Sequence, residues 1–361
     1  MKIGILTYHR AHNYGAMLQA YALRAYLQHQ GHEADFIDYW PSEHANEYRW
    51  LRKINGETWT QRAVNILAAC LTGIRRWLRI KRFDAFRQTY LGLPEKAQYV
   101  QQGARIEEKY DCVVVGSDQI WRNHRTTLEY LGFDPVYFCQ TLAHPARCIS
   151  YAASMGVIRT TEQEDNTLRK YLSDFETITV REASLQQKIA QLGYKSTVVC
   201  DPTLLLNKEE WNSLLLSKRF CKKPYVLYYE MLTYEPAKRY AQKIARERSC
   251  ALLVIPAVIH TRWHQEEQVS IGPLDLIHAI RDAEFVVSTS FHGTAFSVIF
   301  EKQFVSMGAQ TNSDRILTLL SQLQIQDHYT VNEPEQLKPI DYTRTRELKD
   351  AYVRQSKALL K

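Results

Sequence analysis

The fold is decided most clearly by the stretch FVVSTSFHGTAFSVI, residues 285–299. Its first residues, Phe285–Val287, are apolar and β-branched or aromatic, as expected of a buried strand. Hydroxyl side chains and His292 then interrupt the run, and apolar residues resume at helical spacing with Ala295 and Ile299. A strand that leads directly into a helix predicts an α/β lobe. Free backbone N–H groups and the helix dipole then favour an anion at the helix N-terminus, beside His292.

The same alternation of strands and helices runs through most of the chain. Lys2–Tyr8, Ala16–Gln30 and Ala34–Tyr39 form a strand–helix–strand unit, which predicts parallel strands. Further strands are predicted at 111–115, 148–152, 177–180, 197–200, 225–230, 251–255, 285–288 and 304–307, and further helices at 182–192, 236–248, 274–282 and 294–301. Because the pattern recurs on both sides of Asp201-Pro202, the chain is predicted to form two doubly wound Rossmann-like lobes with ligands bound in the cleft between them.

The predicted N-terminal lobe covers residues 1–203, the C-terminal lobe covers 204–340 and carries the Ser290–His292 element, and 341–361 forms a final surface helix. An aromatic, loop-like insertion spans 121–147. A second insertion, about 41–109, is mostly helical and basic. One of its helical faces holds Leu67, Leu71, Ile74 and Leu78, close to Arg75, Arg76, Arg79, Lys81 and Arg82. Such a face either lies on an anionic membrane or packs against its own domain; the second is favoured, because basic amphipathicity discriminates poorly.

Composition narrows the class of protein. The chain has 361 residues, is 45% hydrophobic and carries a net charge of +7, which suggests anionic partners but is too mild to indicate nucleic acid. Its seven cysteines include no CxxC pair, so they are expected to be reduced. The first residues are too polar for a signal peptide, and no apolar run approaches the roughly 20 residues of a membrane span. We expect a cytoplasmic protein, either free or peripheral at the inner face of the cytoplasmic membrane.

Three further strand ends carry chemistry-bearing residues. The loop 9–15 either contacts a ligand, or its residues have structural roles, with Asn13 capping the first helix and Gly15 relieving a tight turn. After the strand 111–115, Asp118 either orients a sugar hydroxyl or acts as its base, with Gln119 hydrogen-bonding the same substrate; the alternative is that Ser117 or Asp118 caps the next turn. Arg181 ends another strand, and its planar fork either grips a carboxylate or phosphate or pairs with its neighbour at the surface.

Several chemistries lack their sequence signals. The chain has no GxGxxG or Walker loop, no HExxH pair and no GxSxG elbow. We therefore expect no bound cofactor, no metal site and no acyl-enzyme.

Taken together, the motifs resemble those of the polysaccharide pyruvyl transferase family. The matching segments, in the family's order from about residue 3 to about residue 325, are 13–21, 115–121, 150–154, 181–182, 201–205 and 290–293. The resemblance implies a two-lobed fold similar to GT-B glycosyltransferases. It also implies transfer of pyruvate from phosphoenolpyruvate to two hydroxyls of one sugar in a bacterial capsular, exopolysaccharide or other surface-glycan precursor, with no cofactor beyond that co-substrate.

The resemblance also assigns roles to residues. His292 and Asp118 would be catalytic, Arg181, Ser290, Gly293 and Thr294 would bind the donor, and Asn13, Tyr14, Gln119 and Trp121 would bind a lipid-linked or nucleotide-linked acceptor. Family members carry an Arg-x-His element, but here Ser290 stands in place of the arginine. Arg262, Arg315 and the helix N-terminus are the candidate replacements. Two other functions stay open: a GT-B-like glycosyltransferase using a nucleotide sugar, and a catalytically idle glycan- or anion-binding protein.

Overall fold

The structure, a computed structural model, describes residues 1–41, 59–124, 132–257, 270–309 and 313–360. Within 61–71, several side chains fall outside this description, Leu71 among them. Arg262, one candidate replacement for the missing arginine, also lies outside the described residues.

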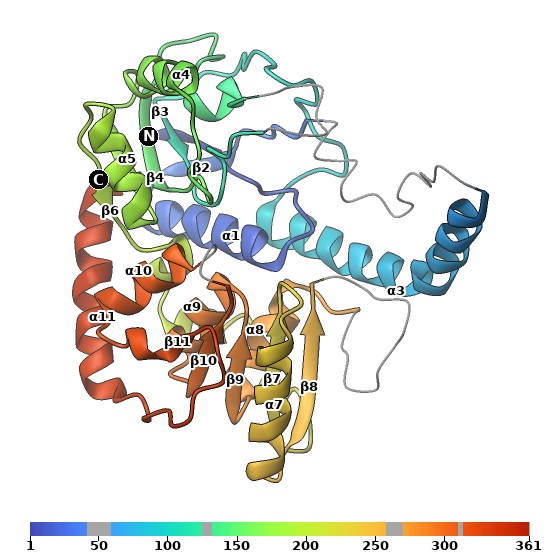
Figure 1. The fold of residues 1–361 in the computed structure, drawn as a ribbon. Helices are drawn as coiled ribbons and strands as arrows, with labels where there is room; N and C mark the ends of the chain where they lie inside the picture. Colours follow the sequence, from blue (N-terminus) through green and yellow to red (C-terminus); the bar gives the residue numbers. More distant parts are fainter. Residues whose placement is uncertain (42–58, 125–131, 258–269, 310–312, 361) are drawn as a thin grey trace.

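Two parallel sheets form the framework of the molecule (Figure 1). The first has the order β2-β1-β3-β4-β5-β6. Its strands are β1 (Lys2–Leu6), β2 (Glu33–Phe36), β3 (Cys112–Val115), β4 (Arg147–Ala153), β5 (Thr177–Val180) and β6 (Thr197–Val198). The second has the order β11-β10-β9-β7-β8. Its strands are β7 (Tyr225–Glu230), β8 (Ala251–Pro256), β9 (Phe285–Ser288), β10 (Phe304–Met307) and β11 (Tyr329–Thr330). The predicted fold class, two Rossmann-like α/β lobes, is confirmed.

Helices cover both sheets and connect their strands. They are α1 (Tyr14–His29), α3 (Trp59–Leu91), α4 (Glu162–Leu172), α5 (Ala183–Gln191), α6 (Lys208–Asn212), α7 (Glu235–Glu247), α8 (Pro273–Asp282), α9 (Phe291–Ile299), α10 (Asp314–Gln322) and α11 (Tyr342–Lys357). Short 3-10 turns are η1 (Pro135–Phe138), η2 (Pro202–Leu205), η4 (Gln326–His328) and η5 (Ala358–Leu360). Each sheet is thereby buried on its faces, as parallel sheets require.

The strands of the first sheet all precede Asp201, and those of the second all follow it. The two lobes nevertheless share one hydrophobic cluster, which includes Leu18 of α1, Leu204 of η2 and Ile277 of α8. Helix α11 runs along one side of both lobes (Figure 1). In α11, Ser356 Oγ accepts a hydrogen bond from Cys200 N at 2.9 Å. The last helix therefore contacts both lobes, in addition to lying at the surface as predicted.

Helix α9 begins three residues earlier than the sequence predicts, at Phe291 instead of Thr294. The reason is Ser290, whose extended backbone and side chain cap the helix: its Oγ accepts a hydrogen bond from Gly293 N at 3.5 Å. His292 consequently stands in the first helical turn rather than in a loop. This shift places its imidazole beside the N-terminus of the helix, where the free N–H groups are.

Helix α3 is 33 residues long and only partly packed against the lobes. Thr72, Arg79, Phe83 and Phe86 form its buried face. On the opposite face, Leu67, Ile74 and Leu78 are exposed. The favoured interpretation, in which this apolar face packs against its own domain, is therefore wrong for its described members. In the described parts of the chain, no helix is long and apolar enough to span a membrane.

The insertion 121–147 is less loop-like than predicted in its described part. Residues 135–138 form the turn η1, and Trp121, Phe133, Tyr137 and Phe138 are buried in the core of the first lobe. Trp121 stacks on Phe138 with ring centroids 5.2 Å apart. These aromatic side chains therefore pack in the hydrophobic core of the first lobe.

Candidate active site

Three of the predicted residues meet where the lobes face each other. Asp118 follows β3, Arg181 follows β5 and His292 follows β9, so each comes from the carboxyl end of a parallel strand. The ligand-binding edge of an α/β sheet is this carboxyl edge. Arg181 and His292 come from different lobes, and both lie against the same carboxylate, that of Asp201.

Asp201 is the centre of this cluster, although the sequence analysis assigned it no chemical role. Its Oδ2 accepts a hydrogen bond from Arg181 Nη1 at 2.8 Å and lies 3.8 Å from His292 Nε2. Its Oδ1 accepts from Thr203 N at 3.0 Å, which caps η2. Burial alone would raise the pKa of Asp201, but its interactions with His292, with the Arg181 guanidinium and with the Thr203 N–H outweigh burial and lower that pKa. Asp201 is therefore an ionised carboxylate in the protein interior.

Arg181 is completely enclosed, with its side chain 1% exposed. Besides the Asp201 contact, its Nη2 lies 3.3 Å from Asp118 Oδ1, and its guanidinium lies over the Phe291 ring at 4.8 Å. Both ends of the fork thus already hold protein carboxylates. This geometry makes Arg181 an anchor for Asp118 and Asp201, and its predicted role as a clamp for the donor stays a prediction.

Asp118 is the most accessible carboxylate of the cluster, with its side chain 16% exposed. It adopts a left-handed backbone conformation, φ 79°, and its Oδ1 also accepts a hydrogen bond from Gln119 N at 2.9 Å. The preceding strand end is fixed by Gly116, where a Cβ would lie 2.0 Å from Tyr151 O. The local backbone therefore presents the Asp118 carboxylate on the loop after β3, beside Arg181.

His292 packs between the lobes. A Cβ placed on Gly15, in the first turn of α1, would lie only 1.9 Å from His292 Nδ1, so glycine is required for the ring to occupy this position. Its Nε2 has no hydrogen-bond partner among the described residues. Burial lowers the pKa of His292, and Arg181 lowers it too, while Asp201 opposes the shift. The imidazole is therefore neutral near pH 7, with one ring nitrogen available to a ligand.

A second guanidinium, that of Arg315 in α10, lies close to this cluster. With the Gln119 amide turned so that its oxygen faces Arg315, this oxygen accepts hydrogen bonds from Nη2 at 2.9 Å and from Nη1 at 3.1 Å. No carboxylate in the described ranges is within ion-pair distance of Arg315. Burial lowers the pKa of Arg315, and the positive charge of Arg181 adds to that effect. An anion placed between the two guanidinium groups would offset both the burial of the Arg315 charge and its repulsion by Arg181.

Glu182 is a further buried acid that sequence reasoning did not select. Its Oε1 accepts hydrogen bonds from Ser154 Oγ at 2.8 Å and Met155 N at 3.0 Å, while Oε2 has no hydrogen-bond partner in the described structure. Burial raises the pKa of Glu182. The alternative in which Arg181 and Glu182 form an exposed surface pair is therefore wrong, because both side chains are buried. No local pattern signals this burial; it arises from the packing of the second lobe against α5.

Several predicted donor residues have structural partners instead. Ser290 caps α9, and Thr294 is buried with its Oγ1 2.6 Å from Ser306 Oγ on β10. A Cβ on Gly293 would lie 2.1 Å from Ser288 Oγ, so this glycine permits close packing of α9 against β9. Donor binding by these three residues stays a prediction. All three lie at the N-terminal end of α9, as His292 does.

The predicted acceptor residues divide into two groups. Gln119 lies in the cluster, as described above. Asn13 caps α1 by accepting a hydrogen bond from Ala16 N at 3.1 Å, and Tyr14 is buried with its hydroxyl 3.3 Å from Ile271 O of the other lobe. Trp121 is buried, and its indole N–H donates to Tyr137 O at 2.9 Å. Such enclosure disfavours a sugar contact for Tyr14 and Trp121 and favours roles in lobe packing.

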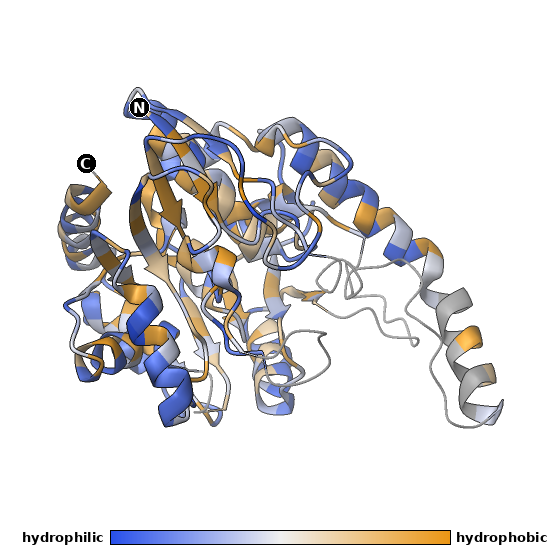
Figure 2. Ribbon diagram, turned by 90° about the horizontal axis from the view of Figure 1, so that it is seen from above, coloured by the Kyte–Doolittle hydropathy of each residue, from blue (hydrophilic) through white to orange (hydrophobic). Residues whose placement is uncertain are grey.

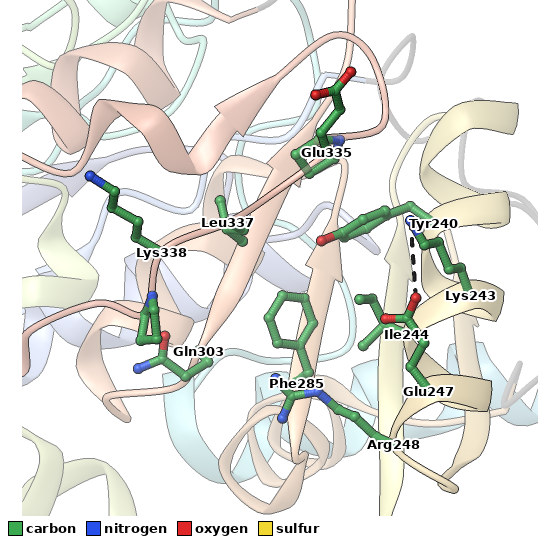
Figure 3. A pocket seen from close by; sticks show the side chains of 12 residues that line it. Tyr240, Lys243, Ile244, Glu247, Arg248, Phe285, Gln303, Glu335, Leu337 and Lys338 are labelled. Atoms are coloured by element: carbon green, nitrogen blue, oxygen red, sulfur yellow. Dashed lines mark ion pairs between the residues drawn. The ribbon is translucent and has the colours of Figure 1, made fainter.

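A hollow on the second lobe lies at the opposite edge of its sheet (Figure 3). Tyr240, Phe285, Gln303 and Leu337 are among its lining residues. Phe285 begins β9 and Gln303 directly precedes β10, so this hollow is at the amino ends of strands, away from His292. In the described ranges, no three His, Cys, Asp or Glu side chains are grouped to share a metal ion.

Comparison with solved structures gives distant matches over most of the chain. Among solved structures, the S. aureus MnaA–UDP co-structure is 12% identical at a TM-score of 0.47, covering 99% of this chain and 91% of the other. A putative UDP-N-acetylglucosamine 2-epimerase from Listeria monocytogenes is 9% identical at a TM-score of 0.46, covering 99% and 87%. No curated protein matches the sequence.

The family is established by sequence. The sequence pattern of the family described as "Polysaccharide pyruvyl transferase" matches residues 13–310. The chain belongs to the polysaccharide pyruvyl transferase family, and this membership implies a transferase that acts on a glycan.

Proposed function

We propose that the protein transfers pyruvate from phosphoenolpyruvate onto two hydroxyls of one sugar, forming a cyclic ketal on a lipid-linked or nucleotide-linked precursor of a bacterial surface glycan. The observation that carries the proposal is the group of His292, Arg181 and Arg315 around buried carboxylates where the two lobes meet. A triply anionic donor needs cationic groups to hold it, and ketal formation needs groups that move protons.

The donor would bind beside Arg315 and the N-terminus of α9. Arg315 contacts only the neutral Gln119 amide in the contacts described, so its charge is available, whereas that of Arg181 is shared by Asp118 and Asp201. Arg315 is one of the three candidate replacements for the arginine that Ser290 displaces. We assign it the role of holding the carboxylate or phosphate of the donor, supported by the free N–H groups of α9.

The reaction can be balanced with the groups present. One hydroxyl proton ends on the methylene carbon of phosphoenolpyruvate, which becomes a methyl group as that hydroxyl oxygen bonds to C2. The second hydroxyl oxygen then bonds to C2 while the C2–O bond to phosphate breaks, and its proton leaves with phosphate. Asp118 would accept the hydroxyl proton, since it is the accessible carboxylate, and His292 would deliver protons to the donor. Neutral in the free protein, His292 gains a proton more readily once the anionic donor is bound.

Mass spectrometry of candidate glycan precursors, incubated with enzyme and phosphoenolpyruvate, tests the proposal together with an assay for released phosphate. We expect a product carrying one pyruvyl ketal and one phosphate released per ketal. Phosphoenolpyruvate alone should raise the melting temperature, whereas UDP or GDP sugars should not. Release of nucleoside diphosphate from a sugar nucleotide would instead establish a glycosyltransferase, and binding of phosphoenolpyruvate or glycan without turnover would favour the idle homologue.

Arg315→Gln gives a sharper test of the donor site. We expect the affinity for phosphoenolpyruvate, measured by calorimetry, to fall about 10- to 100-fold, because a charged hydrogen-bonding partner is lost. Arg169→Gln is the matched control, since Arg169 is an exposed arginine of α4. Equal affinities of the two variants for phosphoenolpyruvate would remove Arg315 from the donor site.

A further inference from the structure

The exposed face of α3 forms an apolar stripe that nothing in the described structure covers. We define the stripe by Ile66, Leu67, Ile74, Trp77 and Leu78, whose exposed fractions are 48%, 61%, 74%, 48% and 40%. At 3.6 residues per turn these positions share one side of the helix, opposite the buried Thr72, Arg79 and Phe83. The stripe extends about 18 Å along the helix axis. Apolar surface on this scale, gathered on one face, marks an interaction site.

The charges around the stripe identify its partner. Residues 59–83 contain six arginines and lysines and no acidic residue, although Arg79 is on the buried face and the Arg82 guanidinium pairs with Asp275 of α8 at 3.3 Å. Lys81 places its ammonium over the Trp77 ring, 5.8 Å from the ring centroid, so a cation lies at the stripe itself. An apolar face bearing a tryptophan and bordered by cations is the composition of helices that bind at the interface of anionic lipid membranes.

A second copy of the chain is a poorer occupant for the same stripe. Pairing two such helices would bring two acid-free, strongly cationic segments together, and like charges disfavour that contact. The fold also presents the stripe outward: Figures 1 and 2 show α3 extending away from the two lobes. The buried face anchors the helix to the body, since Arg79 Nη1 and Nη2 donate to the carbonyl oxygens of Ala257 and Pro256 at 2.6 and 2.7 Å.

We infer that the α3 stripe docks the protein onto an anionic lipid surface. The helix also reaches the proposed site, because Phe83 packs against Tyr14 with ring centroids 4.8 Å apart, one residue before the Gly15 that contacts His292. Docking through α3 therefore holds the site near the lipid headgroups. A lipid-linked rather than a nucleotide-linked acceptor follows, and that consequence alone rests on the proposed function.

Co-sedimentation of the full chain with vesicles tests the inference without donor, glycan or turnover. The probes are vesicles of phosphatidylcholine mixed with phosphatidylglycerol, and vesicles of phosphatidylcholine alone. We expect binding to the anionic vesicles, weaker binding to the neutral ones, and loss of binding as salt is raised. Absence of binding to the anionic vesicles at low salt would overturn the inference, and it would leave the proposed reaction to be judged by its own assay.

A stripe variant, Leu67→Ser with Ile74→Ser and Trp77→Ser, should reduce the vesicle partition coefficient about tenfold or more. The control, Val100→Ser with Leu216→Ser, removes exposed apolar side chains elsewhere and should bind as the unaltered chain does. If the triple variant does not melt cooperatively, the single Ile74→Glu, at the most exposed stripe position, takes its place. Unchanged binding by a folded stripe variant would overturn the inference. A dimer in ultracentrifugation that the stripe variant dissociates, without vesicle binding, would overturn it in favour of a second copy.

Discussion

Gly15→Ala is the substitution whose effect the structure defines most sharply. In an ordinary helix interior, replacing glycine by alanine stabilises the fold by about 1 kcal/mol. At Gly15, the added Cβ would stand 1.9 Å from His292 Nδ1 and 2.4 Å from two ring carbons. Since ordinary contacts begin near 3.4 Å, the ring or the start of α1 must move by more than 1 Å. Overpacking of this kind costs about 1–3 kcal/mol.

The expected change in the free energy of unfolding is the difference between these effects. The cost of overpacking, about 1–3 kcal/mol, is offset by about 1 kcal/mol of helix propensity, which leaves a loss of about 0–2 kcal/mol. Gly73→Ala is the matched control, because Gly73 also lies within a helix and has nothing within 4 Å of its added Cβ. It should gain about 1 kcal/mol. Urea titration of both variants measures the difference, expected at about 1–3 kcal/mol.

The double variant identifies the cause. His292→Ala removes the ring, so Gly15→Ala in that background should stabilise the protein by about 1 kcal/mol, as Gly73→Ala does. Displacement of the ring by about 1 Å should also cost turnover on the order of 100-fold in Gly15→Ala, even where it remains folded. If Gly15→Ala stabilised the unaltered chain as much as it stabilises the His292→Ala chain, the packing of His292 against α1 would be refuted.

Three further variants test the ionic contacts around this site. Burial lowers the pKa of His292, so below about pH 6.5 the unfolded chain takes up a proton that the folded chain resists, and stability falls as the pH drops. In urea titrations at several pH values, His292→Asn should make this fall shallower. Equal pH dependence of stability in the variant and the unaltered chain would contradict the prediction. Arg181→Met leaves Asp201 buried without its cation and should cost about 3–5 kcal/mol in the same measurement; a near-neutral result would show Asp201 protonated or solvated. Ser184→Ala removes the 2.5 Å hydrogen bond to Asp314 between the lobes and should cost about 1.5–3 kcal/mol, whereas no loss would mean that the lobes do not close as described.

The framework of strands was predictable because it depends on local apolar runs. The strands 177–180, 225–230, 285–288 and 304–307 have the predicted bounds. Each is a short apolar or β-branched segment buried in a parallel sheet, and such segments differ strongly from the polar turns that follow them. The start of α9 was less predictable, since Ser290 as a cap competes with Ser290 as a loop residue, and only the Gly293 hydrogen bond decides between them.

The meeting of Asp118, Arg181 and His292 was predictable for a topological reason. Carboxyl ends of parallel strands lie along one edge of a sheet, and two lobes that face each other bring their edges together. Asp201 and Arg315 were harder to select. Asp201 follows the last strand of the first lobe and resembles any Asp-Pro turn, and Arg315 follows a segment without regular pattern. Their importance arises from tertiary contacts, of Asp201 with Arg181 and His292 and of Arg315 with Gln119, which local patterns do not encode.

The proposed donor site has a cation although Ser290 stands in place of the expected arginine, because of how the second sheet is ordered. An arginine at the helix cap has no side-chain acceptor for the Gly293 N–H, whereas Ser290 supplies one. Strand β10 pairs directly with β9, so α10, which follows β10, begins beside α9 at the same carboxyl edge. Arg315, the second residue of α10, thus brings a guanidinium to the same edge of the sheet at which Ser290 stands in place of an arginine. The bond of its neighbour Asp314 to Ser184 holds this helix end against the first lobe, so the placement of the cation depends on the contact between the lobes.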